Sequence, residues 1–255
     1  MARLAACGGS TSVILRRRLA WATVQPLARP WTVAYPPHMR PGSTRHLSRG
    51  RQGKWDGGGV LLDESIARGR VELAAIFGNA RPVELEIGTG KGTFLMGRAP
   101  ARPEVNFLGI EYARPYCLYA ADRVRRARLG NVRMLCCDAG HFVKVCLADR
   151  SLWRMHIYFP DPWPKRRHHH RRLIQRPFVA EARRVLRPGG QLIVVTDHLD
   201  YFRQIVATVE AVDGLAAVPM PGWSDKDGEL VGTNFERKYI AQGRGFYRVV
   251  RMRYV

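Results

Sequence analysis

Residues 83–92 read VELEIGTGKG, an apolar run that passes directly into three glycines at alternate positions. A compact run such as Val83–Ile87 is typical of a parallel strand covered on both faces. Gly88, Gly90 and Gly92 stand between this strand and the helix expected next, where glycine lets backbone N–H groups approach a ligand closely. The stretch predicts a strand, a ligand-binding loop and a helix in succession.

The chain beyond this unit alternates short apolar runs with stretches at helical spacing. Further strands are expected at 107–110, 132–136, 155–159 and 192–196. Helical spacing relates Phe178, Ala182, Val185 and Leu186, before a stop at Arg187–Gly190, and again relates Phe202, Ile205, Val206 and Val209. Residues 246–255 alternate apolar residues with arginine, as in an antiparallel strand at the end of a sheet. The order predicts an α/β fold with a doubly wound, mostly parallel sheet and an antiparallel C-terminal strand.

The spacing of the glycines bears on which ligand the loop holds. The dinucleotide pattern G-x-G-x-x-G requires glycine at position 93, where this chain has Thr93. This disfavours a nicotinamide-dependent oxidoreductase. A G-x-G-x-G loop suits a pyrophosphate less well and fits the smaller amino-acid end of S-adenosylmethionine. Glycines alone remain a weak signal, because loops of many α/β proteins use them.

Carboxylates follow or lie within three of the expected strands. Glu111 ends the second strand, where it can accept both ribose hydroxyls of an adenosine, and Asp138 ends the third, where it can accept from the adenine amino group. The alternative for each is a helix N-cap or a turn acid. Glu86 lies inside the first strand, where burial is costly unless a cofactor ammonium or backbone donors pair with it.

Composition indicates an acidic partner. Lys and Arg number 42 against 21 Asp and Glu, which gives a formal charge of +21 and a pI of about 10.8. Such an excess repels itself unless a polyanion is near, so nucleic acid is the first partner to consider. Because arginine far outnumbers lysine, a biased genome or a solvated basic surface is the competing explanation.

The N-terminal segment differs from the rest of the chain. It contains no acidic residue before Asp56 and many arginines, so we expect residues 1–55 to be a basic, disordered extension, with a transit peptide or an overlong gene model as alternatives. Gly57–Gly59 is then expected to be a linker, and residues 56–255 form the folded domain.

Cysteine and hydropathy patterns give weaker signals. Five cysteines, an odd number, indicate reduced thiols in a cytosol-like compartment, and no apolar stretch is long enough to span a bilayer. Cys136 and Cys137 are expected to point to opposite faces of a strand as structural residues. We therefore expect a cytoplasmic protein without membrane contact, with organellar import as the alternative.

Residues 158–173, YFPDPWPKRRHHHRRL, concentrate the remaining chemistry. Asp161 stands at the end of the fourth strand, Trp163 lies between prolines that stiffen the turn, and a block of cationic and imidazole side chains follows. Three consecutive histidines raise the question of a metal. Neighbouring side chains in a loop seldom converge on one ion, so no metal is expected.

Six motifs in this order resemble the bacterial tRNA (guanine-N7)-methyltransferase family, within the class I S-adenosylmethionine-dependent superfamily. They are LEIGTGKG, GIE, CDA, FPDPWPKRRHHHRRL, LRPGG…TD and TNFE…GRGFYR. The resemblance runs from about Leu61 to the C-terminus. The PDPWPK block with its basic-histidine run is specific to the family, whereas class I methyltransferases share the glycine loop.

The resemblance implies a Rossmann-like fold and methyl transfer from S-adenosylmethionine to N7 of a guanine in the tRNA variable loop. It implies that Glu86, Glu111, Asp138 and Asp161 line the cofactor and the reaction centre, with the glycine loop. It also implies that Lys165, Asp197 and the segment Thr233, Asn234, Phe235, Glu236 hold the substrate. A capping box is the alternative for Thr233 and Glu236, because they have the S/T-x-x-E spacing.

The chemistry of guanine agrees with these roles. N7 carries a lone pair and no proton, so no general base is needed, and Asp161 as the catalytic residue can accept from the Watson–Crick edge. Trp163 can stack on the extruded base, or fill the core instead. Phosphates are then expected to contact Arg166, Arg167, His168, His169, His170, Arg171 and Arg172.

Two other functions stay open at this point. One is a class I methyltransferase with a substrate other than tRNA, and the other is an inactive RNA-binding protein of the same fold. Carboxylates at every strand end disfavour the inactive protein. The motif spelling is that of the bacterial type, which works without a partner subunit, so a monomer or homodimer is expected.

Overall fold

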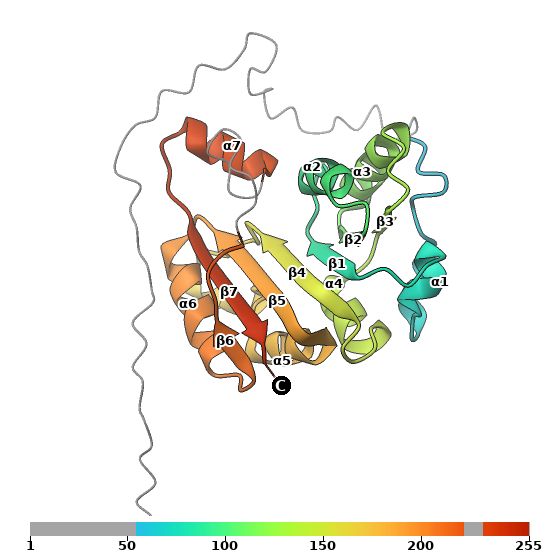
Figure 1. Ribbon diagram of the computed structural model, residues 1–255. Helices are drawn as coiled ribbons and strands as arrows, with labels where there is room; N and C mark the ends of the chain where they lie inside the picture. Colours follow the sequence, from blue (N-terminus) through green and yellow to red (C-terminus); the bar gives the residue numbers. More distant parts are fainter. Residues whose placement is uncertain (1–54, 222–231, 255) are drawn as a thin grey trace, which may run out of the picture.

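A seven-stranded sheet runs through the protein in the order β3-β2-β1-β4-β5-β7-β6 (Figure 1). The computed structural model describes residues 55–221 and 232–254, without the side chain of Asn234. The strands are β1 Val83–Ile87, β2 Asn106–Ile110, β3 Val132–Leu135, β4 Leu152–Tyr158, β5 Leu186–Thr196, β6 Leu215–Ala217 and β7 Tyr247–Arg253. The predicted tail, apart from its last residue, lies outside the described residues.

Helices connect the strands on both faces of the sheet. The α-helices are α1 Leu73–Phe77, α2 Thr93–Ala101, α3 Arg114–Arg126, α4 Ala139–His141, α5 Arg176–Val185, α6 Leu199–Glu210 and α7 Asn234–Ala241. The described residues also form two 3₁₀ helices, η3 Glu64–Arg68 and η5 Arg166–Arg171, and a π-helix, η4 Phe142–Cys146. No helix in the described ranges has the length and apolarity needed to cross a bilayer.

The strand directions confirm the predicted fold class. β1 to β5 pair in parallel, whereas β7 is antiparallel to both β5 and β6. Its position in the chain suggested that the C-terminal strand β7 lies at the edge of the sheet. Instead, β7 lies between β5 and β6. β6 occupies that edge and has only three residues, too short for an alternating pattern to reveal.

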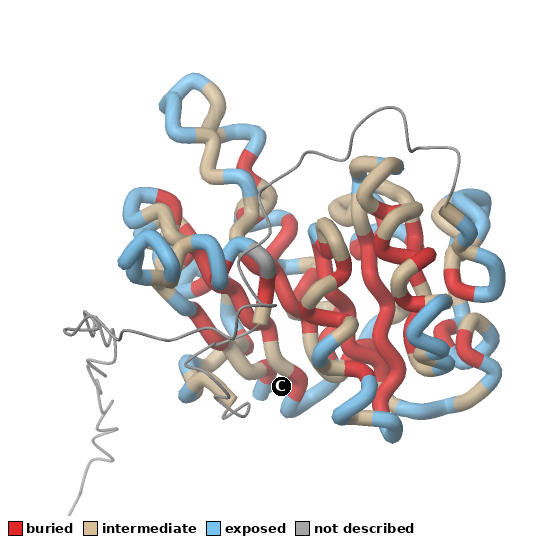
Figure 2. Tube along the Cα trace, turned by 90° about the horizontal axis from the view of Figure 1, so that it is seen from above, coloured by how far each residue is buried: buried red, intermediate tan, exposed pale blue. Residues whose placement is uncertain are grey.

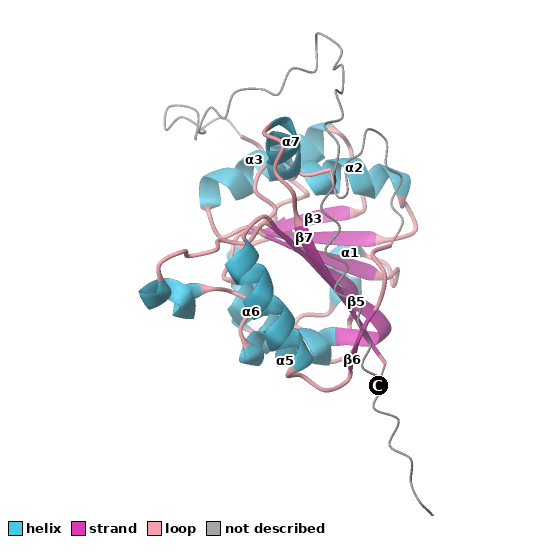
Figure 3. Ribbon diagram, turned by 90° about the vertical axis from the view of Figure 1, so that its left-hand side faces the viewer, coloured by secondary structure: helices cyan, strands magenta, loops and turns pink. Residues whose placement is uncertain are grey.

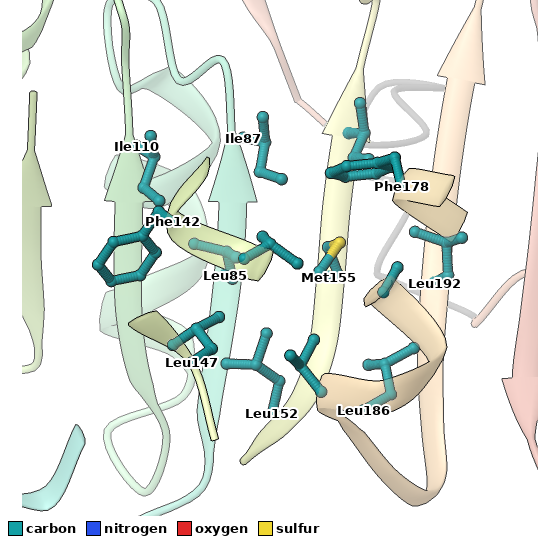
Figure 4. Packing of buried hydrophobic residues seen from close by; sticks show 14 of the residues in the cluster. Leu85, Ile87, Ile110, Phe142, Leu147, Leu152, Met155, Phe178, Leu186 and Leu192 are labelled. Carbon is teal, nitrogen blue, oxygen red and sulfur yellow. The ribbon is translucent and has the colours of Figure 1, made fainter. Parts of the chain in front are cut away.

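Helices lie on both sides of the sheet (Figure 3), and two apolar clusters, one on each face, hold these layers together. Leu85, Met155 and Leu192 point into the cluster that α5 and α6 cover, and Figure 4 shows how closely their side chains lie. On the other face α2 and α3 cover a cluster that includes Phe107 and Val195. Figure 2 shows the buried strands running through the middle of the molecule. Burial on both faces explains the near-continuous apolar runs.

The predicted bounds of β2, β3 and β7 are wrong by one or two residues at a strand end, and those of β4 and β5 by more. The α5 helix ends at Val185, and Leu186 already belongs to β5, which continues through Arg187–Gly190 with a bulge against β4. The RPGG stretch ends the helix as expected but does not leave the sheet, because Gly189 adopts a positive φ of 78°. β4 starts at Leu152 and stops at Tyr158, since Phe159 leaves the extended region.

Gly57–Gly59 is not a linker. These residues form a turn that leads into Val60 and Leu61, and the following backbone pairs with the edge strand β3. The N–H of Met134 donates to the carbonyl of Val60 at 2.9 Å, and the N–H of Leu62 donates to the carbonyl of Met134 at 2.8 Å. The unpaired edge of β3 provides these partners, so the segment is fixed to the sheet.

The vicinal cysteines face opposite sides of the sheet as predicted, but they follow β3 and do not lie within a strand. Cys136 packs against the cluster beneath α2 and α3, and Cys137 packs against the cluster on the opposite face. Both are free thiols, as are Cys117 and Cys146.

Candidate active site

The glycine loop joins β1 to α2 in a conformation that its glycines make possible. Gly88, Gly90 and Gly92 have φ values of +77°, +53° and +69°. These angles are unfavourable for residues with a side chain. A side chain at Gly92 would also bring its Cβ to 3.1 Å from that of Ala120. The chain therefore turns tightly at the carboxyl edge of the sheet before α2 begins.

Glu111, at the end of β2, holds this loop in place. Its Oε2 accepts a hydrogen bond from the N–H of Gly90 at 2.7 Å, and its Oε1 accepts from the N–H of Ala113 at 2.9 Å. The turn-acid interpretation of Glu111 thus describes its contacts in the structure. The residue is half-buried at the same edge, and a carboxylate has further lone pairs for a ligand.

Glu86 is buried without compensation. Its side chain lies on the face of β1 toward α2, and Oε2 has no hydrogen-bond partner among the described residues. Burial, and to a lesser extent the charge of Glu111, raises the pKa of Glu86 to about 8. The hydroxyls of Thr89 and Thr93 beside the loop are likewise buried and unpartnered there. Such acceptors next to the loop fit a ligand that brings donors, including an ammonium group.

Glu84 shares this face of β1 and is fully paired, a feature the sequence analysis missed. Nε2 of His156 lies 2.9 Å from one carboxylate oxygen, and a guanidinium nitrogen of Arg154 lies 2.8 Å from the other. Burial opposes ionisation of Glu84, yet these partners lower its pKa to about 2. Nδ1 of His156 lies 2.8 Å from the hydroxyl of Tyr158. The sequence signal for this pair was an acidic residue, Glu84, and a histidine, His156, each inside an otherwise apolar strand.

Asp138 N-caps the helix α4. Its Oδ1 accepts from the N–H of His141 at 2.6 Å, and the side chain is exposed beyond the end of β3. This is the capping alternative for Asp138. The residue lies at the carboxyl edge, one strand beyond Glu111.

Asp161 lies on a strained turn after β4. Its side chain is exposed, and the residues that flank the Pro-Asp-Pro sequence, Phe159 and Trp163, have φ values of +51° and +43°. Positive φ in large non-glycine residues is rare and clusters at functional sites. The turn begins at the C-terminal end of β4, between β1 and β5 in the sheet.

Trp163 is not a core residue. It is partly exposed and belongs to neither apolar cluster; the guanidinium of Arg171 lies 5.1 Å from its ring centroid. The imidazole of His168 makes an edge contact with the ring at 6.0 Å. The indole therefore belongs to the cationic surface, and the core-filling alternative is wrong.

The cationic run forms η5 and splits into two groups. Lys165, Arg166, Arg167, His170 and Arg171 are exposed, and His168 and His169 are partly exposed. The next residue, Arg172, is buried. Its donors are directed to groups within the protein, so it cannot serve as the phosphate contact that its place in the run suggested. Among the residues that the structure describes, no group of three His, Cys, Asp or Glu side chains is arranged to hold a metal.

The α7 helix begins with a capping box. Oγ1 of Thr233 accepts from the N–H of Glu236 at 3.1 Å, and Oε2 of Glu236 accepts from the N–H of Gly232 at 2.6 Å. The capping alternative therefore describes both side chains, which are buried. Phe235 instead is 50% exposed, with its ring 6.1 Å from that of Phe159.

Asp197 ties the end of α7 back to the sheet. It follows β5 and forms an ion pair with Arg244, whose guanidinium also lies 4.2 Å from the ring centroid of Tyr239. Burial and the negative charge of Asp197 raise the pKa of Tyr239. In Figure 1, α7 lies beyond the ends of β4 and β5, at the edge where α2 starts. The predicted residues thus lie at the carboxyl ends of the parallel strands or in the segments next to those ends.

Comparisons with known proteins agree with this arrangement. A family model described as "Putative methyltransferase" matches residues 80–249. A solved structure of an antibiotic-related methyltransferase is similar, with a TM-score of 0.53 and 16% identity over 77% of this chain and 98% of that one. At that identity the structural similarity supports the fold alone.

Three similar curated sequences carry the name tRNA (guanine-N(7)-)-methyltransferase. The Rhodopirellula baltica protein is 38% identical over 186 residues, covering 70% of this chain and 69% of its own. The Pseudomonas putida protein is 36% identical, with 82% and 86% covered, and the Geobacillus thermodenitrificans protein is 37% identical, with 76% and 89% covered. Together with the family model, this similarity shows that the chain belongs to the tRNA (guanine-N(7)-)-methyltransferase family.

Proposed function

We propose that the protein transfers the methyl group of S-adenosylmethionine to N7 of a guanine in the variable loop of tRNA. The observation that carries this proposal is that three features lie at the carboxyl ends of the parallel strands. These are the glycine loop with unpaired Glu86, the exposed Asp161 on its strained turn, and the cationic helix η5. Family membership supplies the reaction class.

The residues around the glycine loop fit the methyl donor. S-adenosylmethionine carries an electrophilic methyl group on a positively charged sulfur, and an ammonium group on its amino-acid end. We infer that Glu86 accepts from that ammonium and that the half-buried Glu111 accepts from the ribose hydroxyls. Asp138, exposed at the end of β3, has a second oxygen that can face the adenine amino group.

The chain needs to position the base more than to activate it. Guanine N7 bears a lone pair and no proton, so its attack requires no general base. Correct alignment of two reactants supplies on the order of 7–11 kcal/mol of barrier reduction. Asp161 accepts from N1–H and the amino group of guanine, which orients N7. The same carboxylate offsets the positive charge that develops on the purine.

Exposed groups around Asp161 are suited to an extruded nucleotide. Trp163 and Phe235 offer aromatic faces, each worth about 1–3 kcal/mol when a base stacks on it. The exposed cations Lys165, Arg166, Arg167 and Arg171 are placed to contact phosphates next to that nucleotide. We expect the protein to act on tRNA without an obligatory protein partner.

Methylation of a defined transcript tests this function. The protein is incubated with labelled S-adenosylmethionine and an unmodified tRNA transcript, and the nucleosides are separated. We expect label in N7-methylguanosine only, and none in a transcript whose variable-loop guanine is replaced by adenine. Label at another guanine would refute the variable loop as the site. Label on a small molecule but not on tRNA would refute the substrate class.

A further inference from the structure

Arg172 stands apart from the other cations of the run. Its side chain is only 1% exposed, whereas that of Arg171, its neighbour, is open to solvent. Arg172 is the C-cap of η5, and its backbone N–H donates to the carbonyl of His169 at 3.1 Å. The tight 3₁₀ turn directs this one side chain inward beneath the turn that carries Asp161.

The guanidinium of Arg172 joins the turn to α6. Nε donates to the carbonyl of Pro162 at 2.8 Å, and Nη1 donates to Oε1 of Gln204 at 2.6 Å. Nη2 lies 2.7 Å from Oδ2 of Asp200 and 2.9 Å from Nε2 of His169. A guanidinium keeps its charge and its planar set of donors, so it can bond all these acceptors at once.

Tyr201 completes the surroundings of this guanidinium. The guanidinium carbon lies 4.8 Å from the centroid of the Tyr201 ring, and the Tyr201 hydroxyl accepts from the N–H of Ile174 at 3.0 Å. Tyr201 is fully buried, so the ring beneath the guanidinium is part of the protein core. Asp200, Tyr201 and Gln204 all belong to α6, which starts just after β5.

The turn formed by residues 159–163 needs a stabilising contact from another part of the protein at its Trp163 end. Phe159 and Trp163 both have positive φ, a conformation that persists only where surrounding contacts maintain it. At the first end, the N–H of Phe159 donates to the carbonyl of Val195 at 2.7 Å. Prolines have no N–H, so a carbonyl is the backbone group that Pro162 can offer. Arg172 binds that carbonyl, one residue beyond Asp161.

We propose that Arg172 is a positioning residue for methyl transfer: by binding the Pro162 carbonyl and α6 together, it fixes the turn that presents Asp161 to the guanine. It does not contact tRNA. The proposal rests on the role given to Asp161 above. It distinguishes Arg172 from the exposed arginines of η5, which act on tRNA affinity through phosphates.

Kinetics at several salt concentrations separate positioning from phosphate contact. For Arg172→Lys and Arg172→Met we expect kcat on tRNA to fall at least tenfold, with the slope of log(kcat/KM) against log[salt] unchanged. Lysine keeps the charge but cannot reproduce the planar donor set. Arg167→Met, at an exposed cation, should instead raise KM for tRNA and reduce the slope by about 0.7–0.9.

Arg184→Met is the matched control for loss of a structural arginine. Arg184 pairs with Asp149 and donates to the carbonyls of Val143 and Leu147, before the start of β5. This variant should lower the thermal midpoint while kcat stays within twofold of the wild type. A change in salt slope with unchanged kcat in Arg172→Met would make Arg172 a phosphate contact and overturn the proposal.

Hydrogen exchange provides a readout that does not depend on activity. In both Arg172 variants, amides of the segment 159–168 should exchange at least tenfold faster than in the wild type, and in Arg184→Met they should not. Unchanged exchange in this segment would overturn the proposal even if activity fell. If the wild-type protein methylates no tRNA, the proposed function fails, while the exchange result still decides the role of Arg172.

Discussion

Glu84 and Glu86 lie two residues apart on one face of β1, both buried, and only Glu84 is paired. His156 and Arg154 bond to the carboxylate of Glu84, whereas Oε2 of Glu86 has no partner in the described part of the chain. Their pKa values are accordingly shifted in opposite directions, to about 2 for Glu84 and about 8 for Glu86. The carboxylate of Glu84 is paired within the sheet, and we propose that the carboxylate of Glu86 accepts from a ligand.

Glu86→Gln should change how stability depends on pH. From about pH 4.5 to 8 the unfolded chain has lost the Glu86 proton and the native protein keeps it. The native state therefore loses stability as pH rises through this window, by up to about 1.4 kcal/mol per pH unit. Glu86→Gln has no carboxyl group at this position, so its free energy of unfolding should not show this decrease. Urea unfolding of the ligand-free proteins at pH 5 and pH 8 measures it.

The free energy of unfolding of Glu86→Gln, relative to that of the wild type, should be higher at pH 8 than at pH 5. The variant should also bind S-adenosylmethionine at least tenfold more weakly. Glu210→Gln, at an exposed carboxyl of α6, is the matched control. If the stability difference between Glu86→Gln and the wild type is the same at pH 5 and pH 8, the raised pKa of Glu86 is wrong.

Glu84→Gln should destabilise the protein without touching the ligand site. The substitution breaks a pair in which Glu84 is fully buried and Arg154 is largely buried, and it leaves the charge of Arg154 without its carboxylate, which costs about 3 kcal/mol at pH 7. Because the pKa of Glu84 is lowered, its contribution is present above about pH 4.5 and is lost as pH falls toward 2. Chemical denaturation at pH 7 and pH 3 checks both statements, and a loss below 1 kcal/mol at pH 7 would contradict them.

Phe235→Ala should weaken tRNA binding while leaving the fold intact. The ring is half-exposed, so its loss should change unfolding free energy by no more than about 0.5 kcal/mol. Loss of stacking should raise KM for tRNA by roughly fivefold to a hundredfold. The comparison is Phe246→Ala, whose partly buried ring packs against Phe159 and whose loss should destabilise the protein. An unchanged KM for tRNA in Phe235→Ala would exclude a stacking role.

The sequence was enough to predict which residues lie at the carboxyl ends of the strands, because buried parallel strands have a recognisable apolar pattern and a common direction. Val83–Ile87, the glycine loop and the acids after β2 and β3 all follow from burial on both faces and from the common direction of parallel strands. The same rules give the position of Asp161 after β4. Positive φ at Phe159 and Trp163 does not follow, since neither residue type favours that conformation.

Individual side-chain roles depended on contacts that the sequence does not contain. Arg172 is one of several cations in a row, and only the 3₁₀ turn and the acceptors on α6 distinguish it from its exposed neighbours. The pairing of Glu84 with His156 joins residues 72 positions apart, and so depends on β1 lying beside β4. By contrast, the Thr233–Glu236 capping box is local, and its spacing alone indicated it.

The central claim is that Asp161 meets the guanine at the edge where the glycine loop holds the methyl donor. The most direct measurement is single-turnover methylation of unmodified tRNA by Asp161→Asn, with circular dichroism to verify folding. The variant should fold like the wild type, and its transfer rate should fall at least about a hundredfold, because the amide is neutral and no longer offsets the charge that develops on the purine. A rate within threefold of the wild type would contradict the account.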